Sequence, residues 1–427
     1  MPQLLELGIH DPIPPQIERP AGGRADASRS GRAVPQVGRG RRVALLAVHH
    51  VRVDGQTLTG GAEKYIQQAI EALLRVGTRV HVGYSGDSIY DELLAAHGPN
   101  ELTVERTGWL DENLSGDARL DLGVFLQRRR WLRAVHADTV FAVQQASGGA
   151  FVNSLLAAKS LRLRVVTSIR QMPETPAEAA PRLKGMLPAP RLWQRRPVWR
   201  RRIPAWCADA MIFNSRRVAE GYARQYGFSR DRCCVIRNGE TALGAVQTPA
   251  ARALRIAAVG RVTAAKGADT LFDAFSIVAR RNPAARLTYY GDGPLVPILQ
   301  ARARNSGLAE RVRFAGYLSD RARIYDEVDI CVQASRRESM ANSVIEAMAR
   351  GIPCIVSNVG GLPEMLVDEA SGLVVPPEDA RKLAEALARL LTDSDLYSRI
   401  RSAAARRARS LFDPYEFQRA TVAAILG

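Results

Sequence analysis

The chain has 427 residues, 46% of them hydrophobic, which is enough for two domains of ordinary size with their own cores. No apolar run approaches the roughly 20 residues that a membrane-spanning helix needs, and no signal peptide is recognisable. A net charge of +17 and a pI of about 10.3 favour anionic partners such as nucleic acid, anionic lipid or phosphorylated substrates. A basic but otherwise ordinary surface is the alternative interpretation.

The cysteines indicate a reducing compartment. They form no Cys-x-x-Cys pair and show no zinc-ligand spacing, so we interpret them as small buried apolar residues. Together with the missing signal peptide, this predicts a cytoplasmic protein. The five positions are Cys207, Cys233, Cys234, Cys331 and Cys354.

The first part of the chain alternates between predicted strands and helices. Residues 1–41 are rich in Pro, Gly, Arg and Ser and predict a disordered basic tail. An N-terminal domain is then expected over 42–240, since a buried strand at 43–48 leads through a glycine-containing loop to a helix from about Ala62. Further strands are predicted at 79–84, 139–143 and 164–169, and helices at 125–135 and 150–161.

A basic segment with interleaved tryptophans follows at 182–206. This pattern is typical of an anionic membrane interface, and it also suits nucleic-acid phosphates with base stacking. A solvated basic helix with buried tryptophans is the third interpretation. The prolines at 188, 190, 197 and 204 are expected to break any long helix. The candidate anion patch comprises Arg195, Arg196, Trp199, Arg200, Arg201 and Arg202.

A second domain is predicted over 254–411, after a small, polar linker at 241–253. It opens with a strand, a loop that contains Arg261 and Lys266, and a helix. Two cations at the carboxyl end of a strand can stabilise a phosphate or diphosphate. Amphipathic helices are predicted at 379–391 and 393–411, before a last helix within 412–427.

The stretch from 329 to 367 is the most informative part of the chain. It predicts a strand at 329–334, an irregular loop at 335–341, and a helix capped by Asn342 or Ser343. The loop therefore brings Glu338 to the carboxyl end of a parallel strand, where open α/β sheets bind ligands. Glu346 follows on the helix. Two carboxylates beside a phosphate site fit a ligand that also carries hydroxyls, such as a nucleotide sugar.

These motifs resemble those of retaining glycosyltransferases of family 4, which have the GT-B fold. The glutamates are similar to the family's Glu-x7-Glu motif, and the sequence around them, including 347–353 and 359–364, is similar as well. The family also has counterparts of Gly-Gly-Ala-Glu at 60–63 and of Gly-Arg-x4-Lys-Gly at 260–267. The resemblance covers roughly residue 43 onwards. It implies an α/β protein of two Rossmann-like parallel-sheet domains that face each other across a cleft, with residues 412–427 crossing back to the N-terminal domain.

The resemblance implies roles for individual residues. Arg261 and Lys266 would stabilise the leaving diphosphate, Glu338 would contact the transferred sugar, and Glu346 would hold the ribose hydroxyls. Many members have a histidine near Ile169, where this chain has Ile169-Arg170, so the acceptor side departs from the family pattern. Further donor-side residues are Ser339, Met340, Ala341, Gly60, Gly61, Gly316 and Tyr317; the acceptor-side residues are His50, Glu63 and Arg170.

The expected activity is retaining transfer of a sugar from a nucleoside diphosphate sugar to a hydroxyl acceptor, without a cofactor. No Asp-x-Asp motif lies in a fitting place, so we expect no metal. The acceptor is expected in glycan, lipid-linked saccharide or glycoconjugate synthesis. The basic segment favours a lipid-linked or otherwise anionic acceptor and peripheral contact with the inner face of the membrane; no specific nucleic acid is expected.

Two alternatives stay open at this point. One is a GT-B enzyme of another kind, either a nucleotide-sugar epimerase or a phosphorylase, although a phosphorylase would normally need a pyridoxal phosphate lysine and the chain has only five lysines. The other is a non-catalytic GT-B protein that binds an anionic membrane or nucleic acid. Binding to random nucleic acid that weakens strongly with salt, without binding of any donor, would favour the second alternative.

Overall fold

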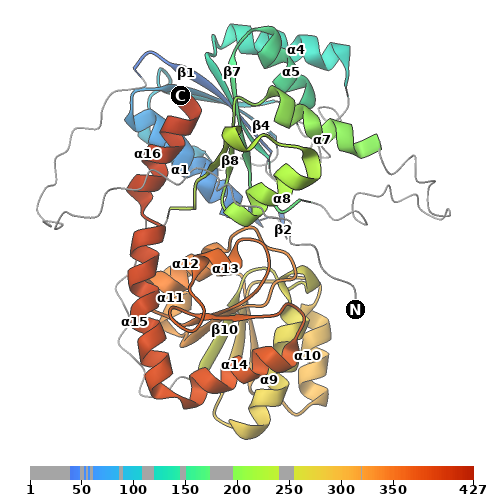
Figure 1. Ribbon diagram of the computed structural model, residues 1–427, viewed down its shortest axis with the longest axis vertical. Helices are drawn as coiled ribbons and strands as arrows, with labels where there is room; N and C mark the ends of the chain where they lie inside the picture. Colours follow the sequence, from blue (N-terminus) through green and yellow to red (C-terminus); the bar gives the residue numbers. More distant parts are fainter. Residues whose placement is uncertain are drawn as a thin grey trace, which may run out of the picture.

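The computed structural model describes two α/β domains that lie one above the other along the long axis of the molecule (Figure 1). The described residues are 39–48, 52–53, 56–57, 61–85, 90–107, 120–144, 151–173, 196–239, 254–318 and 320–427. Most of the predicted basic tail, the linker, His50, Gly60 and Arg195 lie outside these ranges. The predicted domain limits themselves stay predictions.

The N-terminal domain contains a seven-stranded sheet in the described residues, and every pairing in it is parallel. The strand order reverses between β1 and β6, as in a doubly wound sheet. A short antiparallel pair, β2 (Arg52–Val53) and β3 (Gln56–Thr57), follows β1. In spatial order the seven strands are β5 (Leu102–Arg106), β4 (Arg79–Ser85), β1 (Arg42–Val48), β6 (Thr139–Gln144), β7 (Arg164–Ile169), β8 (Ala210–Phe213) and β9 (Cys233–Val235).

The C-terminal domain repeats this plan with six parallel strands. Its order reverses between β10 and β13. The two sheets together confirm the predicted Rossmann-like, two-domain architecture. The strands in spatial order are β12 (Val312–Gly316), β11 (Arg286–Tyr290), β10 (Arg255–Val259), β13 (Ile330–Gln333), β14 (Cys354–Ser357) and β15 (Leu373–Val375).

Helices bury their apolar faces against both sheets and form separate cores in the two domains. In the N-terminal domain the described helices are α1 (Gly61–Arg75), α2 (Asp91–Ala96), α4 (Leu122–Ala134), α5 (Val152–Ser160), α7 (Arg196–Cys207) and α8 (Arg216–Tyr226), with the 3-10 turn η2 (Arg230–Arg232). The later helices are η3 (Ala264–Lys266), α9 (Ala268–Arg281), α10 (Val296–Asn305), α11 (Arg321–Asp326), α12 (Asn342–Ala349), α13 (Leu362–Met365), α14 (Ala380–Thr392), α15 (Ser394–Leu411) and α16 (Pro414–Leu426).

The last two helices belong to different domains, although only Phe412 and Asp413 separate them. Helix α15 packs on α12 and α14 of the C-terminal domain, whereas α16 packs on α1 of the N-terminal domain (Figure 1). Phe417 of α16 meets Tyr65 of α1 edge to face, with 5.7 Å between the ring centroids. Gly239 lies beside Pro414 and Phe417. The end of the N-terminal domain's own segment and the start of α16 are therefore neighbours in space.

The prediction that prolines interrupt the basic segment is wrong for its last part. Helix α7 begins at Arg196 and contains Pro204. Pro197 is tolerated because it lies in the first turn, where the backbone N–H would have no partner in the helix. Only Pro204 removes an internal hydrogen bond. The structure describes no side chain of this helix before Arg202.

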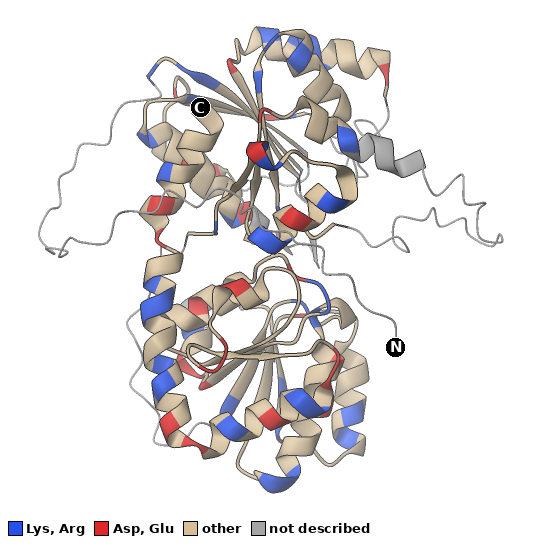
Figure 2. Cartoon of the chain, in the orientation of Figure 1, with Lys and Arg blue, Asp and Glu red and all other residues tan. Residues whose placement is uncertain are grey.

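Figure 2 shows basic and acidic residues interspersed along the helices of both domains. None of the helices in the described ranges combines the length and apolar character needed to cross a bilayer.

Candidate active site

The carboxyl ends of β10 and β13 bring the predicted donor-side loops together. These two strands are neighbours at the point where the strand order of the C-terminal sheet reverses. The chain leaves β10 into the loop with Arg261 and Lys266, and it leaves β13 into the loop with Glu338. Because loops on both sides of such a reversal diverge, a crevice forms between them, and ligands of open α/β sheets bind there.

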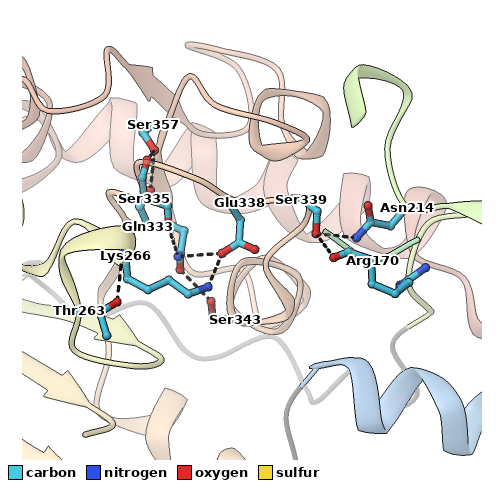
Figure 3. Close-up of polar contacts among 10 residues, drawn as sticks. All are labelled: Arg170, Asn214, Thr263, Lys266, Gln333, Ser335, Glu338, Ser339, Ser343 and Ser357. Atoms are coloured by element: carbon cyan, nitrogen blue, oxygen red, sulfur yellow. Dashed lines mark hydrogen bonds and ion pairs between the residues drawn. The ribbon is translucent and has the colours of Figure 1, made fainter. Parts of the chain in front are cut away.

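Lys266 and Glu338 form an ion pair across this crevice (Figure 3). Lys266 is the last residue of η3, and Thr263 is the N-cap of this short helix. The Thr263 hydroxyl accepts from the backbone N–H of Lys266 at 3.4 Å. Glu338 is the more buried partner, with 11% of its side chain exposed. Arg261 is exposed on the same loop and pairs with no acidic residue in the described part of the chain. The site therefore holds two cations and one carboxylate.

A polar network that the sequence interpretation missed supports Glu338. Gln333, the last residue of β13, places its Nε2 3.4 Å from a Glu338 oxygen and donates to the Ser335 hydroxyl at 2.7 Å. Its own amide oxygen accepts from Ser343 at 3.1 Å, and Ser357 donates to the Ser335 carbonyl at 2.5 Å (Figure 3). Three of these residues are 4% exposed or less, and Ser343 is 7% exposed. A glutamine at a strand end has no motif of its own, so spacing alone could not indicate this network.

Gly267 lets the two loops come into contact. Its φ is +68°, and an added Cβ would lie 1.9 Å from the carbonyl oxygen of Ala334. Arg336 lies two residues after Ala334 in the Glu338 loop. Its two terminal guanidinium nitrogens donate to the two carboxylate oxygens of Asp269, in the first turn of α9, at 2.7 and 2.8 Å. Burial alone would raise the pKa of Asp269, but the hydrogen bonds and charge of Arg336 lower it below its usual value. The Glu338 loop is thus fixed to the loop that carries Lys266.

Glu346 lies one helical turn into α12 and is only 4% exposed. The hydroxyl of Tyr325, which is fully buried, donates to its carboxylate at 2.7 Å. Lys64, on α1 of the other domain, lies 3.9 Å from the second carboxylate oxygen. The carboxylate is therefore held by a buried phenol from its own domain and faces a cation from the opposite one.

The predicted cap of α12 by Asn342 or Ser343 is wrong. Ala341 occupies the N-cap position, and no side chain caps the helix. Both predicted side chains have other partners: Asn342 accepts from the Asn238 amide at 2.6 Å, and Ser343 donates to Gln333. A tertiary contact to each side chain replaces the local cap that sequence alone favours.

The three residues after Glu338 have backbone N–H groups without a partner in the described part of the chain. Met340 and Ala341 are buried in the core of the C-terminal domain. In the part of the chain that the structure describes, the backbone N–H groups of Ser339, Met340 and Ala341 donate no hydrogen bond. Unpaired N–H groups that precede a helix suit an anion or a sugar hydroxyl.

Both neighbours of Glu338 contact the N-terminal domain. The Ser339 hydroxyl donates to the carbonyl of Arg170 at 2.7 Å and accepts from Asn214 at 3.1 Å (Figure 3). On the other side of Glu338, Arg337 donates to the carbonyl of Pro173 at 3.0 Å. The loop that carries Glu338 is therefore part of the contact between the domains.

A second contact between the domains uses Glu364. Its carboxylate accepts from the backbone N–H groups of Arg216 and Arg217, at 3.0 and 2.7 Å, at the start of α8. Arg237 lies 3.8 Å away. A carboxylate at a helix N-terminus is favourable because of the free N–H groups and the helix dipole there.

The remaining predicted residues are spread more widely. Gly61 begins α1, where an added Cβ would lie 3.0 Å from the Asn342 amide, and Glu63 is buried in the first turn. Gly316 ends the edge strand β12, two strands from β10, and Tyr317 is 43% exposed there. In the candidate anion patch, Arg196, Trp199, Arg200 and Arg201 lie on α7 but their side chains are outside the description; Arg202 is exposed.

No group of three His, Cys, Asp or Glu residues gathers into a metal-binding cluster within the described ranges. All five cysteines are free thiols, and four of them are buried. Burial raises the pKa of the Cys207 thiol to about 11, so it is protonated near neutral pH. Both observations agree with the interpretation of the cysteines as packing residues.

Two family models match most of the chain. Residues 59–239 match "Glycosyltransferase Family 4", and residues 253–393 match "Glycosyl transferases group 1". Similar curated proteins include the mannosylfructose-phosphate synthase of Agrobacterium fabrum (34% identical over 167 residues, 37% of each chain) and the alpha-D-kanosaminyltransferase of Streptomyces kanamyceticus (31% over 149 residues, 34% of this chain and 39% of the relative). The matches thus span well under half the length of these relatives.

Solved structures resemble the molecule as a whole. The Anabaena protein HepE in complex with UDP superimposes with a TM-score of 0.67 at 19% identity, covering 89% of this chain and 97% of HepE. Sucrose-phosphate synthase of Thermosynechococcus elongatus superimposes with a TM-score of 0.66 at 21% identity, covering 88% of this chain and 96% of the synthase. At such identities the likeness concerns the fold. With both family models matched in order on two Rossmann-like domains, the chain belongs to the GT-B glycosyltransferases of the group 1 and family 4 type.

Proposed function

We propose that this protein transfers a sugar from a nucleoside diphosphate sugar to a hydroxyl acceptor, with retention of configuration at the anomeric carbon. The observation that carries the proposal is the meeting of Lys266 and Glu338 where the C-terminal strand order reverses, with Glu346 buried on the next helix. The relative HepE has been crystallised with UDP and with UDP-glucose, which supports a nucleotide sugar as donor.

The proposed chemistry exchanges one carbon–oxygen bond for another. The bond from the anomeric carbon to the diphosphate breaks, and the acceptor oxygen bonds to the same face of that carbon. The acceptor proton passes to an oxygen of the leaving diphosphate. Lys266 and Arg261 would stabilise the charge that develops on the diphosphate, and Glu338 the positive charge on the sugar.

Donor binding would require Lys266 and Glu338 to separate. The cavity between β10 and β13 that Arg261, Lys266 and Gln333 help to line is only about 20 Å³, far below the several hundred Å³ of ligand pockets. The diphosphate of the donor would replace Glu338 as the ion-pair partner of the Lys266 ammonium, and the Glu338 carboxylate would then contact the sugar. Backbone N–H groups of 339–341 would then hold sugar hydroxyls.

The test is a calorimetric titration with a panel of nucleoside diphosphates and their sugars, with EDTA present, beside a Glu346→Ala variant. We expect micromolar binding of one base, weakened in the variant and unaffected by EDTA, since the two cations would replace a metal. The anomeric configuration of a product, read by NMR, would then test retention. Nucleotide-sugar turnover without any acceptor would favour the epimerase alternative, and no binding would favour the non-catalytic one.

We further propose a lipid-linked or otherwise anionic acceptor at the inner face of the membrane. The supporting observation is that Trp206 is 72% exposed on α7, one turn from the exposed Arg202. An exposed tryptophan beside arginine suits a membrane interface. The variant with Arg200, Arg201 and Arg202 changed to Ser should bind anionic liposomes less and bind donor as before; unchanged liposome binding would contradict this proposal.

A further inference from the structure

Arg170 lies at the boundary of the two domains, directly after β7. Only 8% of the residue is exposed. Its carbonyl oxygen accepts the hydrogen bond from Ser339, the residue after Glu338, as Figure 3 shows. Arg170 therefore faces the proposed sugar-binding loop from the opposite domain.

The guanidinium group of Arg170 is buried without an acidic partner. Its Cζ lies 3.8 Å from the ring centre of Tyr65, and one terminal nitrogen donates to the Asn238 amide oxygen. The other terminal nitrogen, Nη1, is buried and makes no hydrogen bond within the described residues. Burial lowers the Arg170 pKa to about 10, and the one ionisable group that opposes this effect is Tyr65. The group is thus still a cation near neutral pH.

A buried cation without a carboxylate is unfavourable for the protein alone. Loss of hydration is only partly offset by one amide oxygen and one aromatic face. Two other cations near the same boundary do have acids: Arg237, with 14% of its side chain exposed, lies by Glu364, and Lys266, with 29% exposed, pairs with Glu338. An anion from outside the chain would supply what Arg170 lacks.

The position of Arg170 links it to the donor side. Asn238, which accepts from the guanidinium, donates through its own amide to Asn342 at 2.6 Å. Asn342 is the first residue of α12, the helix that carries Glu346. A chain of three side chains thus crosses the boundary between the domains, and separation of the domains would break it at Asn342. The guanidinium and its two partners from its own domain, Tyr65 and Asn238, would stay together on the face that Asn342 leaves.

The leaving diphosphate already has two cations, Arg261 and Lys266, on the other domain. We therefore propose that Arg170, oriented by Asn238, binds a carboxylate or phosphate on the sugar substrate itself, either on the transferred sugar or on the acceptor. The planar, five-donor guanidinium matches such groups in a bidentate manner. This inference rests on the proposed glycosyl transfer and narrows its substrates to charged sugars.

Two matched sets of ligands distinguish the two sources of the anion. For the donor, the protein is titrated with UDP-glucose and UDP-glucuronate, which differ in a C6 carboxylate. For the acceptor, glucose, glucuronate and glucose 6-phosphate are compared by ligand-observed NMR, with and without saturating UDP. We expect the charged member of one set to bind at least about tenfold tighter than the neutral one, equal to about 1.4 kcal/mol.

Variants separate recognition from structural support. Arg170→Gln should remove the preference for the charged ligand, Arg170→Lys should retain part of it, and the surface control Arg389→Gln should leave it unchanged. Equal affinity for charged and neutral ligands in the wild-type protein, with UDP itself bound, would overturn the inference and leave the proposed function intact. An Arg170→Gln variant that loses both ligands equally would assign Arg170 a structural role. Absence of any nucleotide binding would instead count against the proposed function.

Discussion

Lys266 and Arg170 face the boundary of the domains from opposite sides and differ in how their charge is balanced. Lys266 has a carboxylate partner, Glu338, within its own domain. Arg170 has an amide and an aromatic ring but no acid among the described residues. Lys266 is therefore balanced within its own domain, whereas Arg170 has no counter-charge among the described residues. Four substitutions test this contrast.

The largest effect is expected for Gly360→Ala, which would disrupt the loop that carries Glu338, the partner of Lys266. An added Cβ would lie 1.8 Å from the carbonyl oxygen of Glu338, at a φ of +48°. Overpacking and the left-handed backbone together should cost about 4 kcal/mol in the free energy of unfolding, measured by urea denaturation. Gly307→Ala is the control, because its φ is +68° but nothing lies near its Cβ; it should cost about 1–2 kcal/mol. An equal loss of unfolding free energy in the two variants would show that the Glu338 loop shifts to accommodate the added Cβ.

The next largest effect is expected for Lys266→Ala on catalysis. Loss of a fixed cation at the leaving group should lower kcat by about 10²–10³-fold, or about 3–4 kcal/mol in the barrier. The rate of sugar transfer from the donor identified by calorimetry is the measurement. Lys382→Ala, which removes a surface lysine paired with Glu385, should leave the rate unchanged. A Lys266→Ala enzyme of normal rate would remove Lys266 from the mechanism.

A moderate effect is expected for Glu364→Ala, which tests how firmly the two halves are held together. The variant leaves the N–H groups of Arg216 and Arg217 at the start of α8 without their carboxylate. We expect a loss of about 1–2 kcal/mol for the closed arrangement and a larger radius of gyration in solution scattering. Glu369→Ala removes a surface pair with Arg389 and should not change the radius. An unchanged radius in both variants would show that other contacts hold the domains.

The smallest effect is expected for Asp269→Asn, which weakens the support of the Glu338 loop. Because the Asp269 pKa is lowered in the folded protein, its stabilisation is present above the unfolded pKa of about 3.9 and is lost as the pH falls through the lower, folded value. The variant should lose about 0.5–1 kcal/mol at pH 7 and progressively less as the pH falls below about 3.9. Urea midpoints measured across this pH range test this, with Glu385→Gln as the surface control. A deficit that persists at low pH would refute an ionic origin.

The sequence was sufficient to predict the fold, and to bring the loops of Lys266 and Glu338 together, for one physical reason. In a parallel sheet every strand points the same way, so strand–loop–helix patterns place successive loops at one edge. Lys266 and Glu338 lie 72 residues apart in the chain, yet each follows its own strand, and the strands are neighbours. The position of each residue relative to the end of its own strand was therefore enough to predict that Lys266 and Glu338 lie close together.

The N-terminal half could not be predicted in this way. The surroundings of Arg170 come from α1, from the segment after β9 and from the start of α12, and no local pattern specifies their approach. The same limitation explains the wrong cap at Asn342: its side chain meets Asn238, which is 104 residues away in the sequence. Gln333 and Tyr325, which support the two glutamates, are buried polar residues whose partners become apparent only in three dimensions.

The contact of α16 with the N-terminal domain has a consequence for the order in which the protein folds. Phe417, Val422, Ile425 and Leu426 belong to the same core as Tyr65 and Ile70. On the ribosome these residues are made after the whole C-terminal sheet, at about 5–20 residues per second. The domain whose synthesis starts first thus acquires its last core residues only after the second domain has been made. Until then the apolar surface of α1 that α16 will cover stays exposed, and the nascent chain has to avoid aggregation through it.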